Sequence, residues 1–316
     1  MSDQTVHRVA VIGTGVIGAS WTSYFLGKGL SVTAYDPSPD AATELRQTVT
    51  KQWPAMQKLG LSPGATIDAL SFAASPEAAA AEADFIQENG PERLDLKREL
   101  IARLDAAAPA DAIIATSSST IMVSEFQDAC TAGPERLVLG HPFNPPHLIP
   151  LVEVAGGRAT APWAIDRAIA FYRAIGKHPI HLKKESRGHV ANRLQAALWQ
   201  EAFHLVASGV ATVADIDAAI SHGPGLRWAL LGPFLNLQLS GGAGGIAALF
   251  DKPLWRATEA MWRDLGTVSV DAELGQRVSD GVLSELAPYQ AQQLVEQRDD
   301  VLLELLRLKA NSSQLP

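Results

Sequence analysis

A glycine-rich segment near the start of the chain constrains the fold more than any other feature. The apolar run Val9–Ile12 opens directly into G-T-G-V-I-G, the pattern G-x-G-x-x-G at the end of a predicted strand. The first glycine suits a tight turn, the second lets the backbone approach a ligand, and the third lets the next helix pack closely. Free N–H groups at that helix start favour an anion, which predicts a site for the pyrophosphate of a dinucleotide. We assign to this site Gly13, Gly15, Val16, Ile17 and Gly18.

A second apolar run, Leu30–Tyr35, ends in Asp36, about twenty residues after the glycines. A carboxylate at that place accepts hydrogen bonds from a ribose diol and repels a 2′-phosphate. We therefore expect NAD rather than NADP as the cofactor. The structural alternative is a glycine turn followed by a solvated aspartate.

Composition excludes several classes of protein. The 316 residues are 47% hydrophobic and 19% charged, which is typical of a globular chain with one large domain or two ordinary ones. A net charge of -8 argues against a nucleic-acid or anionic-membrane binder, and no apolar run is long enough to span a membrane. Met1–Val6 lacks the features of a signal peptide, and the single cysteine, Cys130, excludes an internal disulfide. With no H-E-x-x-H motif either, we expect a cytoplasmic protein without a metal.

Apolar runs alternate with helical patterns through the first half of the chain. Such alternation produces right-handed crossovers and a mostly parallel sheet, whose ligands bind beyond the carboxyl ends of the strands. The expected strands are Arg8–Ile12, Ser31–Tyr35, Leu70–Ala73, Asp84–Gln87, Ala112–Thr116, Leu137–Leu139, Leu151–Val154 and Pro179–Leu182. The clearest expected helices between them are Ala19–Lys28, Ala41–Leu59, Leu94–Ala107 and Ala164–Ile175.

The pattern changes after about residue 185. Lys184–Gly188 is a polar linker, His189–Val206 has the spacing of one long helix, and little period-two alternation follows. We therefore predict an α/β fold in two domains. Residues 1–185 form an NAD-binding Rossmann-type domain with a mostly parallel sheet, and residues 186–316 form an all-helical domain for substrate binding and dimerisation.

Four polar side chains fall where the sheet presents its carboxyl edge or where the long helix begins. Ser119 follows the fifth strand, His141 follows the sixth, Glu153 lies in the next strand, and Asn192 lies near the helix start. Oxidation of an alcohol needs an acceptor for the hydroxyl proton, and histidine suits this role because its ordinary pKa is near neutrality. We predict His141 as the base, Glu153 as its orienting carboxylate, and Ser119 and Asn192 as partners of the substrate oxygen. Each also has a structural alternative, such as a helix cap for Asn192. We assign no role to His189, which helical spacing puts on another face from Asn192.

Several segments resemble the 3-hydroxyacyl-CoA dehydrogenase family, in its order and near its spacing, from residue 8 to about residue 235. They are G-T-G-V-I-G, E-N-G-P-E-R-L-D-L-K, S-S-S, G-H-P-F-N-P-P-H-L-I-P-L-V-E-V and G-H-V-A-N-R-L. The block that contains H-P-F-N-P and L-V-E-V is the most specific of these. The resemblance implies that His141 and Glu153 form the catalytic pair and that Ser119 and Asn192 contact the substrate oxygen.

The resemblance also implies further contacts and an assembly. Glu92 and Lys97, in E-R-L-D-L-K, correspond to a glutamate and a lysine that the family uses near the nicotinamide. The family usually pairs through its helical domain, and the segment 213–250 is apolar enough to form a partner surface. We therefore expect a homodimer.

The family includes enzymes of CoA thioesters and enzymes of small free acids. CoA carries phosphates, and its binders in this family are rich in lysine after the second strand. Here three basic residues of that region are cancelled by three acidic ones: Arg46, Lys51 and Lys58 against Asp40, Glu44 and Asp68. This balance is a poor platform for a polyanion, so we expect a small 3-hydroxy acid as the substrate.

Two branches of the family act on carnitine and on L-gulonate, and the segment Gly223–Phe234 resembles both. The segments Q-W-P-A and L-W-Q-E-A-F-H-L-V are closer to the first, so we expect oxidation of L-carnitine to 3-dehydrocarnitine. A quaternary ammonium group is best bound by aromatic faces, and a carboxylate by arginine. The candidate substrate residues are Phe143, Trp199, Arg227, Trp228 and Phe234. L-gulonate, a 3-hydroxyacyl-CoA and a crystallin-like, NAD-binding structural role stay as alternatives.

Overall fold

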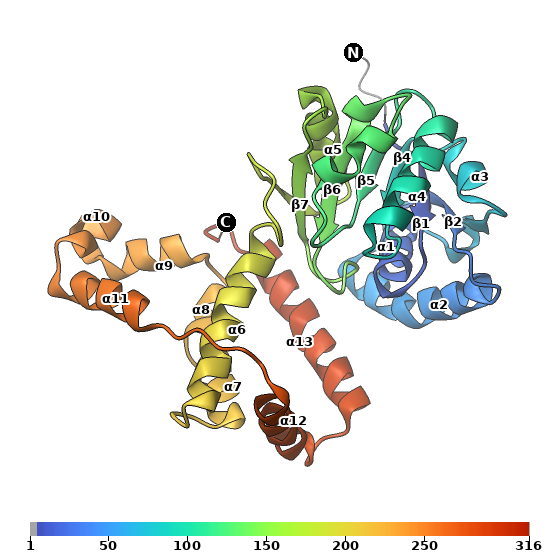
Figure 1. The fold of residues 1–316 in the computed structure, drawn as a ribbon. Coiled ribbons are helices and arrows are strands. Elements are labelled where there is room, and N and C mark those ends of the chain that lie inside the picture. The colour runs from blue at the N-terminus through green and yellow to red at the C-terminus, as the bar shows by residue number, and fades with distance from the viewer. Residues whose placement is uncertain (1–4, 316) are drawn as a thin grey trace. The chain divides into compact units, whose positions relative to one another are not determined.

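The computed structural model describes residues 5–315 and forms two compact units, divided between Arg193 and Leu194 (Figure 1). The first unit contains the whole sheet and the first turn of helix α6 (Ala191–Ala207). The second unit contains only helices and turns among its described residues. The functional boundary that the sequence predicts after residue 185 stays a prediction.

The first unit is built on an eight-stranded sheet in the order β3-β2-β1-β4-β5-β6-β7-β8. Its first six strands are parallel, β7 is antiparallel to β6, and β8 is parallel to β7. The strand order reverses at β1, which pairs with both β2 and β4, and this is where such sheets bind a ligand. The strands are β1 (Arg8–Ile12), β2 (Ser31–Tyr35), β3 (Leu70–Phe72), β4 (Phe85–Glu88), β5 (Ile113–Thr116), β6 (Leu137–Pro142), β7 (Leu151–Gly156) and β8 (His178–His181).

Helices cover both faces of this sheet. One hydrophobic core lies under α1, α2 and α5, and a second lies under α3 and α4. Alternate residues of each strand enter alternate cores: Val9 and Val11 belong to the first, whereas Ala10 and Ile12 belong to the second. The helices are α1 (Val16–Gly27), α2 (Ala41–Leu59), α3 (Pro76–Ala80), α4 (Leu94–Ala107) and α5 (Pro162–Ala174), with short 3-10 turns η1 (Ile67–Ala69), η2 (Val123–Glu125), η3 (Gln127–Ala129) and η4 (Pro134–Arg136).

The second unit continues α6 and adds seven helices and one 3-10 turn. They are α7 (Val213–Ser221), α8 (Pro224–Trp228), α9 (Pro233–Ser240), η5 (Gly242–Gly244), α10 (Gly245–Phe250), α11 (Pro253–Asp264), α12 (Ala272–Leu286) and α13 (Ala291–Ala310). Few of its large apolar side chains are buried, whereas many on α6, α8, α9, α11 and α13 are exposed. No helix within residues 5–315 has the length and apolar character needed to cross a membrane.

The predicted fold class is confirmed: a mostly parallel sheet is followed by a helical part. Several predicted bounds differ from the structure by one to three residues, and two of these differences affect the site. The sixth strand does not end at Leu139 but continues through His141 to Pro142, because pairing with β7 extends it. The long helix does not begin at His189 but at Ala191, because Gly188 and His189 have φ values of 72° and 52° and reverse the chain.

Candidate active site

The glycine-rich loop has the close approaches that a dinucleotide fold requires. A Cβ atom built on Gly13, whose φ is 84°, would lie 2.7 Å from the carbonyl oxygen of Asn89 at the end of β4. A Cβ atom on Gly18 would lie 1.8 Å from the Gly13 carbonyl oxygen, so neither glycine can be replaced without movement. Gly15 caps α1 and has open space at its Cβ position, which leaves the backbone N–H groups of Val16 and Ile17 accessible. These features fit a bound pyrophosphate.

Asp36 follows β2 and braces the same loop. Its Oδ2 accepts a hydrogen bond from the Thr14 backbone N–H at 2.8 Å, and its Oδ1 accepts one from the Ser38 N–H at 3.0 Å. The carboxylate is partly exposed and still has lone pairs free to accept hydrogen bonds from a ribose. The arrangement therefore fits the nucleoside half of NAD.

His141 and Glu153 face each other across an antiparallel strand pair. They are register partners in β6 and β7, and side chains at such positions project from the same face of a sheet. His141 Nδ1 lies 3.0 Å from Glu153 Oε2, and both side chains are buried. The carboxylate accepts from Nδ1–H, which leaves Nε2 as the acceptor nitrogen of a neutral ring.

The second oxygen of Glu153 fixes the entry to α6. Oε1 accepts hydrogen bonds from the backbone N–H groups of Val190 at 2.9 Å and Ala191 at 3.0 Å. Burial favours the neutral acid, but the hydrogen bonds from His141 and these two amides hold the pKa of the Glu153 carboxyl below its ordinary value. Glu153 is therefore an ionised side chain that accepts hydrogen bonds at both carboxylate oxygens.

One serine of the loop after β5 reaches the histidine. Ser119 Oγ lies 3.1 Å from His141 Nε2, whereas Ser117 Oγ donates to Asn89 Oδ1 at 2.7 Å and Ser118 Oγ donates to Glu92 at 2.8 Å. Asn89 thus connects this serine loop, Ser117–Ser119, to the glycine-rich loop. The glycine-rich loop and the His141–Glu153 pair are therefore connected, within the first unit, through Asn89 and the serine loop.

Glu92 and Lys97 lie beneath the serine loop. Besides Ser118, Glu92 accepts hydrogen bonds from the backbone N–H groups of Thr120 at 2.6 Å and Ile121 at 3.0 Å. Burial opposes its ionisation, but these donors hold the pKa of the Glu92 carboxyl below its ordinary value. Lys97 is buried, and its Nζ is 3.9 Å from Glu92 Oε2.

Lys97 has a stronger partner that the sequence analysis missed. Its Nζ donates to both carboxylate oxygens of the fully buried Glu88, at 3.0 and 3.1 Å. Glu88 also accepts from Gly90 N–H and from the Thr116 hydroxyl, each at 2.6 Å. The buried ion pair therefore joins α4 to the end of β4, and the Thr116 hydrogen bond joins the ends of β4 and β5. This role was not predicted, because a glutamate at a strand end is usually solvated.

Asn192 and Phe143 border the histidine pair. Asn192 lies in the first turn of α6, next to the two amides that bind Glu153, and is half-buried with no side-chain hydrogen bond to another described residue. The ring of Phe143 lies edge-on to that of His141, with 5.8 Å between centroids. His189, to which the sequence assigned no role, is buried with its ring 4.9 Å from the His141 ring.

The other candidate substrate residues belong to the second unit. Trp199 lies on α6, Arg227 and Trp228 on α8, and Phe234 on α9, and all four are exposed. Arg227 makes no side-chain hydrogen bond or ion pair with another described residue, and the three aromatic rings make no ring contact there. Their assignment to the substrate stays a prediction.

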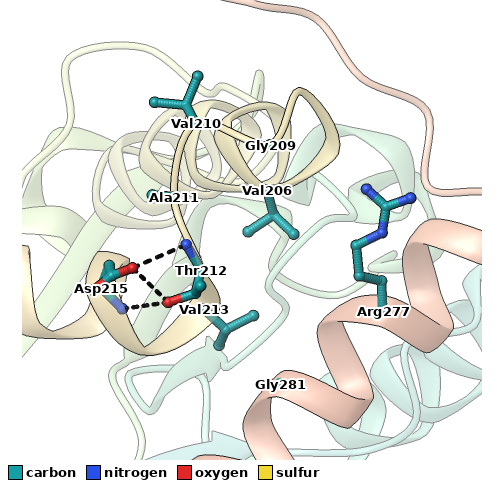
Figure 2. Close-up of a pocket in the computed structure, with 9 residues that line it drawn as sticks. All are labelled: Val206, Gly209, Val210, Ala211, Thr212, Val213, Asp215, Arg277 and Gly281. Atoms are coloured by element: carbon teal, nitrogen blue, oxygen red, sulfur yellow. Dashed lines mark hydrogen bonds between the residues drawn. The ribbon is translucent and has the colours of Figure 1, made fainter.

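A surface pocket of the second unit has no counterpart in the predicted site. Figure 2 shows it where α6 leads into α7, beside Arg277 and Gly281 of α12. Thr212 and Asp215 cap α7 reciprocally, and the hydrogen bonds from Thr212 hold the pKa of Asp215 below its ordinary value. The capping groups satisfy each other, so the pocket offers no group set up for chemistry. Within the described chain, no cluster of three or more His, Cys, Asp or Glu side chains is placed to hold a metal ion.

Comparison with known proteins agrees with this geometry. Residues 8–186 match the family model "3-hydroxyacyl-CoA dehydrogenase, NAD binding domain", and residues 188–284 match "3-hydroxyacyl-CoA dehydrogenase, C-terminal domain". A solved FHMPC 5-dehydrogenase, described as an NAD+ dependent dismutase, is 28% identical with a TM-score of 0.83 and covers 98% of this chain and 100% of its own. A 3-hydroxybutyryl-CoA dehydrogenase from Escherichia coli is 29% identical with a TM-score of 0.64, over 75% of this chain and 50% of its own.

Curated relatives match over nearly the whole chain. The L-carnitine dehydrogenase of Streptomyces griseus is 49% identical over 304 residues, which cover 96% of this chain and 90% of that protein. The L-carnitine dehydrogenase of Bacillus cereus is 44% identical over 308 residues, which cover 98% of this chain and 94% of that protein. With both family models matched, the chain belongs to the 3-hydroxyacyl-CoA dehydrogenase family, as an NAD-dependent oxidoreductase.

Proposed function

We propose that this protein oxidises the 3-hydroxyl of L-carnitine to give 3-dehydrocarnitine, with NAD as the cofactor. The observation that carries the proposal is the His141–Glu153 pair, with His141 Nε2 facing the hydroxyl of Ser119. Identities of 44–49% to proteins named L-carnitine dehydrogenase support this substrate over others of the family.

His141 is the base of the proposed reaction. Glu153 holds the proton on Nδ1, so Nε2 is free to take the hydroxyl proton of the alcohol. The imidazolium that forms is stabilised by the ionised carboxylate 3.0 Å away. Ser119 and the unpaired amide of Asn192 hold the substrate oxygen at that nitrogen. In the reverse direction His141 returns the proton to the oxygen.

NAD is held by the glycine-rich loop and Asp36, with Glu92 and Lys97 on the nicotinamide side. When bound, it accepts the hydride that leaves the carbinol carbon. Gly15 and the first-turn amides of α1 bind the pyrophosphate, and the Asp36 carboxylate binds the ribose diol. Replacing Asp36 by alanine removes both a hydrogen-bond acceptor and a negative charge. It should therefore weaken the binding of NAD and raise the ratio of kcat/KM with NADP to kcat/KM with NAD by about tenfold or more. An unchanged ratio would place ribose recognition elsewhere.

The trimethylammonium and carboxylate groups of carnitine need different partners. Phe143, Trp199, Trp228 and Phe234 offer aromatic faces for the cation, and Arg227 offers a fork of donors for the carboxylate. If Trp228 binds the cation, its replacement by alanine raises the KM for carnitine more than the KM for L-gulonate. Equal increases for both substrates would indicate a packing role.

A substrate comparison at fixed NAD tests the function itself. NADH formation at 340 nm is measured with L-carnitine, L-gulonate and 3-hydroxybutyryl-CoA, and L-carnitine should give the highest kcat/KM. His141→Ala should lower kcat on the order of 10²-fold or more while NAD still binds. As a matched control, replacement of the exposed His181 should leave turnover unchanged. A higher kcat/KM with L-gulonate or 3-hydroxybutyryl-CoA would reassign the protein within its family. Binding of NAD without turnover of any of the three substrates would favour a structural role.

We also propose a homodimer in the cytoplasm. The exposed apolar side chains of the helical unit support a second copy as their partner, because soluble monomers rarely expose so many together. In the segment 213–250, apart from the candidate substrate residues, they are Leu226, Leu230, Leu235, Leu239 and Phe250. The single cysteine, Cys130, is buried and free, which is usual for proteins of a reducing compartment.

A further inference from the structure

His189 has a backbone conformation that an imidazole side chain does not favour. Its φ of 52° is left-handed, directly after Gly188 with a φ of 72°. This conformation is uncommon and unfavourable for residues other than glycine. The side chain is nevertheless buried, so the energy of its contacts must offset the cost of the turn.

The His189 ring joins two parts of the catalytic network. Its Nε2 lies 2.9 Å from the Ser118 carbonyl oxygen, which can only accept, so Nε2 carries the proton. The other side of the ring contacts His141, with 4.9 Å between centroids and 54° between planes. Burial is the largest cause that lowers the pKa of His189, and the nearby His141 adds to it.

The position of Ser119 depends on the backbone that His189 holds. Ser118 has its hydroxyl bound to Glu92 and its N–H bound to the Thr116 hydroxyl at 3.2 Å. The His189 hydrogen bond holds the remaining group, the carbonyl, which is the one bonded to the nitrogen of Ser119. A shift of this peptide would move the Ser119 hydroxyl away from His141 Nε2.

The turn at His189 also serves the opposite side of His141. The next two residues, Val190 and Ala191, donate their N–H groups to Glu153. The same turn therefore holds the serine loop through a side chain and the orienting carboxylate through the backbone. Ser119 of the serine loop contacts His141 Nε2, and the Glu153 carboxylate contacts His141 Nδ1.

We propose that His189 is a positioning residue for the reaction: its Nε2–H holds the Ser118 carbonyl so that Ser119 and His141 stay in register. This inference rests on the proposed function, because it assigns a role at the same site. His189 itself needs no contact with substrate or cofactor.

Two substitutions separate the hydrogen bond from packing. His189→Phe keeps a ring against His141 but removes the donor, and His189→Gln keeps a donor near the place of Nε2. Both carry a similar backbone cost at a positive φ. We expect His189→Phe to lower kcat about 10- to 100-fold, since a misplacement near 1 Å can cost that much. The Kd for NAD should change less than about twofold, and His189→Gln should recover kcat to within about fivefold of the original protein.

The exposed His181, replaced by phenylalanine, provides the control and should have normal kcat. Histidine ring ¹⁵N spectra give a readout that needs no turnover: the His141 resonances should shift in His189→Phe and stay near their original values in His189→Gln. Equal kcat for both variants, whether normal or reduced, would overturn the inference, as would unshifted His141 resonances in His189→Phe. If the unaltered protein oxidises none of the three substrates, the proposed function fails, and the ring spectra still decide the role of His189.

Discussion

At the residue scale, the two oxygens of Glu153 perform separate tasks. Oε2 accepts the hydrogen bond from His141 Nδ1, and Oε1 accepts hydrogen bonds from the backbone N–H groups of Val190 and Ala191. Glu153→Gln keeps an acceptor for the amides but removes the charge behind the histidine. We expect kcat to fall on the order of 10²-fold or more, because the imidazolium loses its counter-charge. NADH formation measures this, and Glu82→Gln, at an exposed carboxylate, is the control.

The same substitution should also change how stability depends on pH. The pKa of Glu153 is lower in the folded protein than in the unfolded chain, so folding is favoured by its ionisation. Its contribution is complete above the unfolded pKa and is lost as pH falls through the lower folded pKa. As pH falls from about 5 to about 3, urea midpoints should therefore fall less steeply for Glu153→Gln than for the original protein. Parallel pH profiles would show that the carboxylate is not held ionised by the fold.

At the element scale, α1 connects the cofactor loop to the segment between β6 and β7. Ser20, one turn into α1, accepts the His147 N–H at 2.8 Å, and its hydroxyl lies 2.7 Å from His147 Nδ1. Ser20→Ala leaves a buried N–H without this acceptor, at a cost of about 1–3 kcal/mol. We expect a lower melting temperature and a kcat reduced several-fold, because the loop follows His141 directly.

Ser23 provides the matched control on the same helix. It is also buried, but its hydroxyl is bound to the Ala19 carbonyl and to Gln52, away from the β6–β7 loop. Ser23→Ala should lower stability and leave kcat near its original value. Equal losses of kcat in the two variants would mean that α1 does not transmit its position to the catalytic strand.

Elements with local signals were predictable, and those set by distant pairing were not. The helices Ala41–Leu59 and Leu94–Ala107 and the strand Arg8–Ile12 begin and end where their patterns predict. The sixth strand extends three residues beyond its predicted end at Leu139, because its last residues pair with β7 as far as Pro142 and Val152. The same antiparallel register brings His141 against Glu153, which a spacing of twelve residues suggests but does not require.

His189 and Lys97 show the same limit at the site. Helical spacing extends smoothly through His189, and nothing local reveals the left-handed turn that instead aims its ring at His141. The resemblance to the family placed Lys97 near the cofactor, but its buried partner Glu88 belongs to another element. Candidate residues could be identified from the sequence, whereas the residues that they contact depend on how distant segments come together in the fold.

At the scale of the whole molecule, the sheet unit and the helical unit differ in how they bury apolar side chains. The sheet unit has two continuous cores, one on each face. In the helical unit, the buried large apolar side chains are Val206, Leu249, Leu274 and Leu303 among the described residues. A unit that exposes this much apolar surface needs a cover, and the proposed second copy supplies one.

Light scattering after size exclusion tests that assembly. The particle should have twice the 33.6 kDa mass of one chain. Leu239, on α9, is 69% exposed within the segment expected to pair, so Leu239→Glu would bury a charge in each half of a symmetric interface. We expect a dissociation constant raised on the order of 10²-fold, since two unpaired charges are desolvated together. Leu61→Glu, on the sheet unit, is the control and should leave the mass unchanged; a monomer before any substitution would refute the pairing.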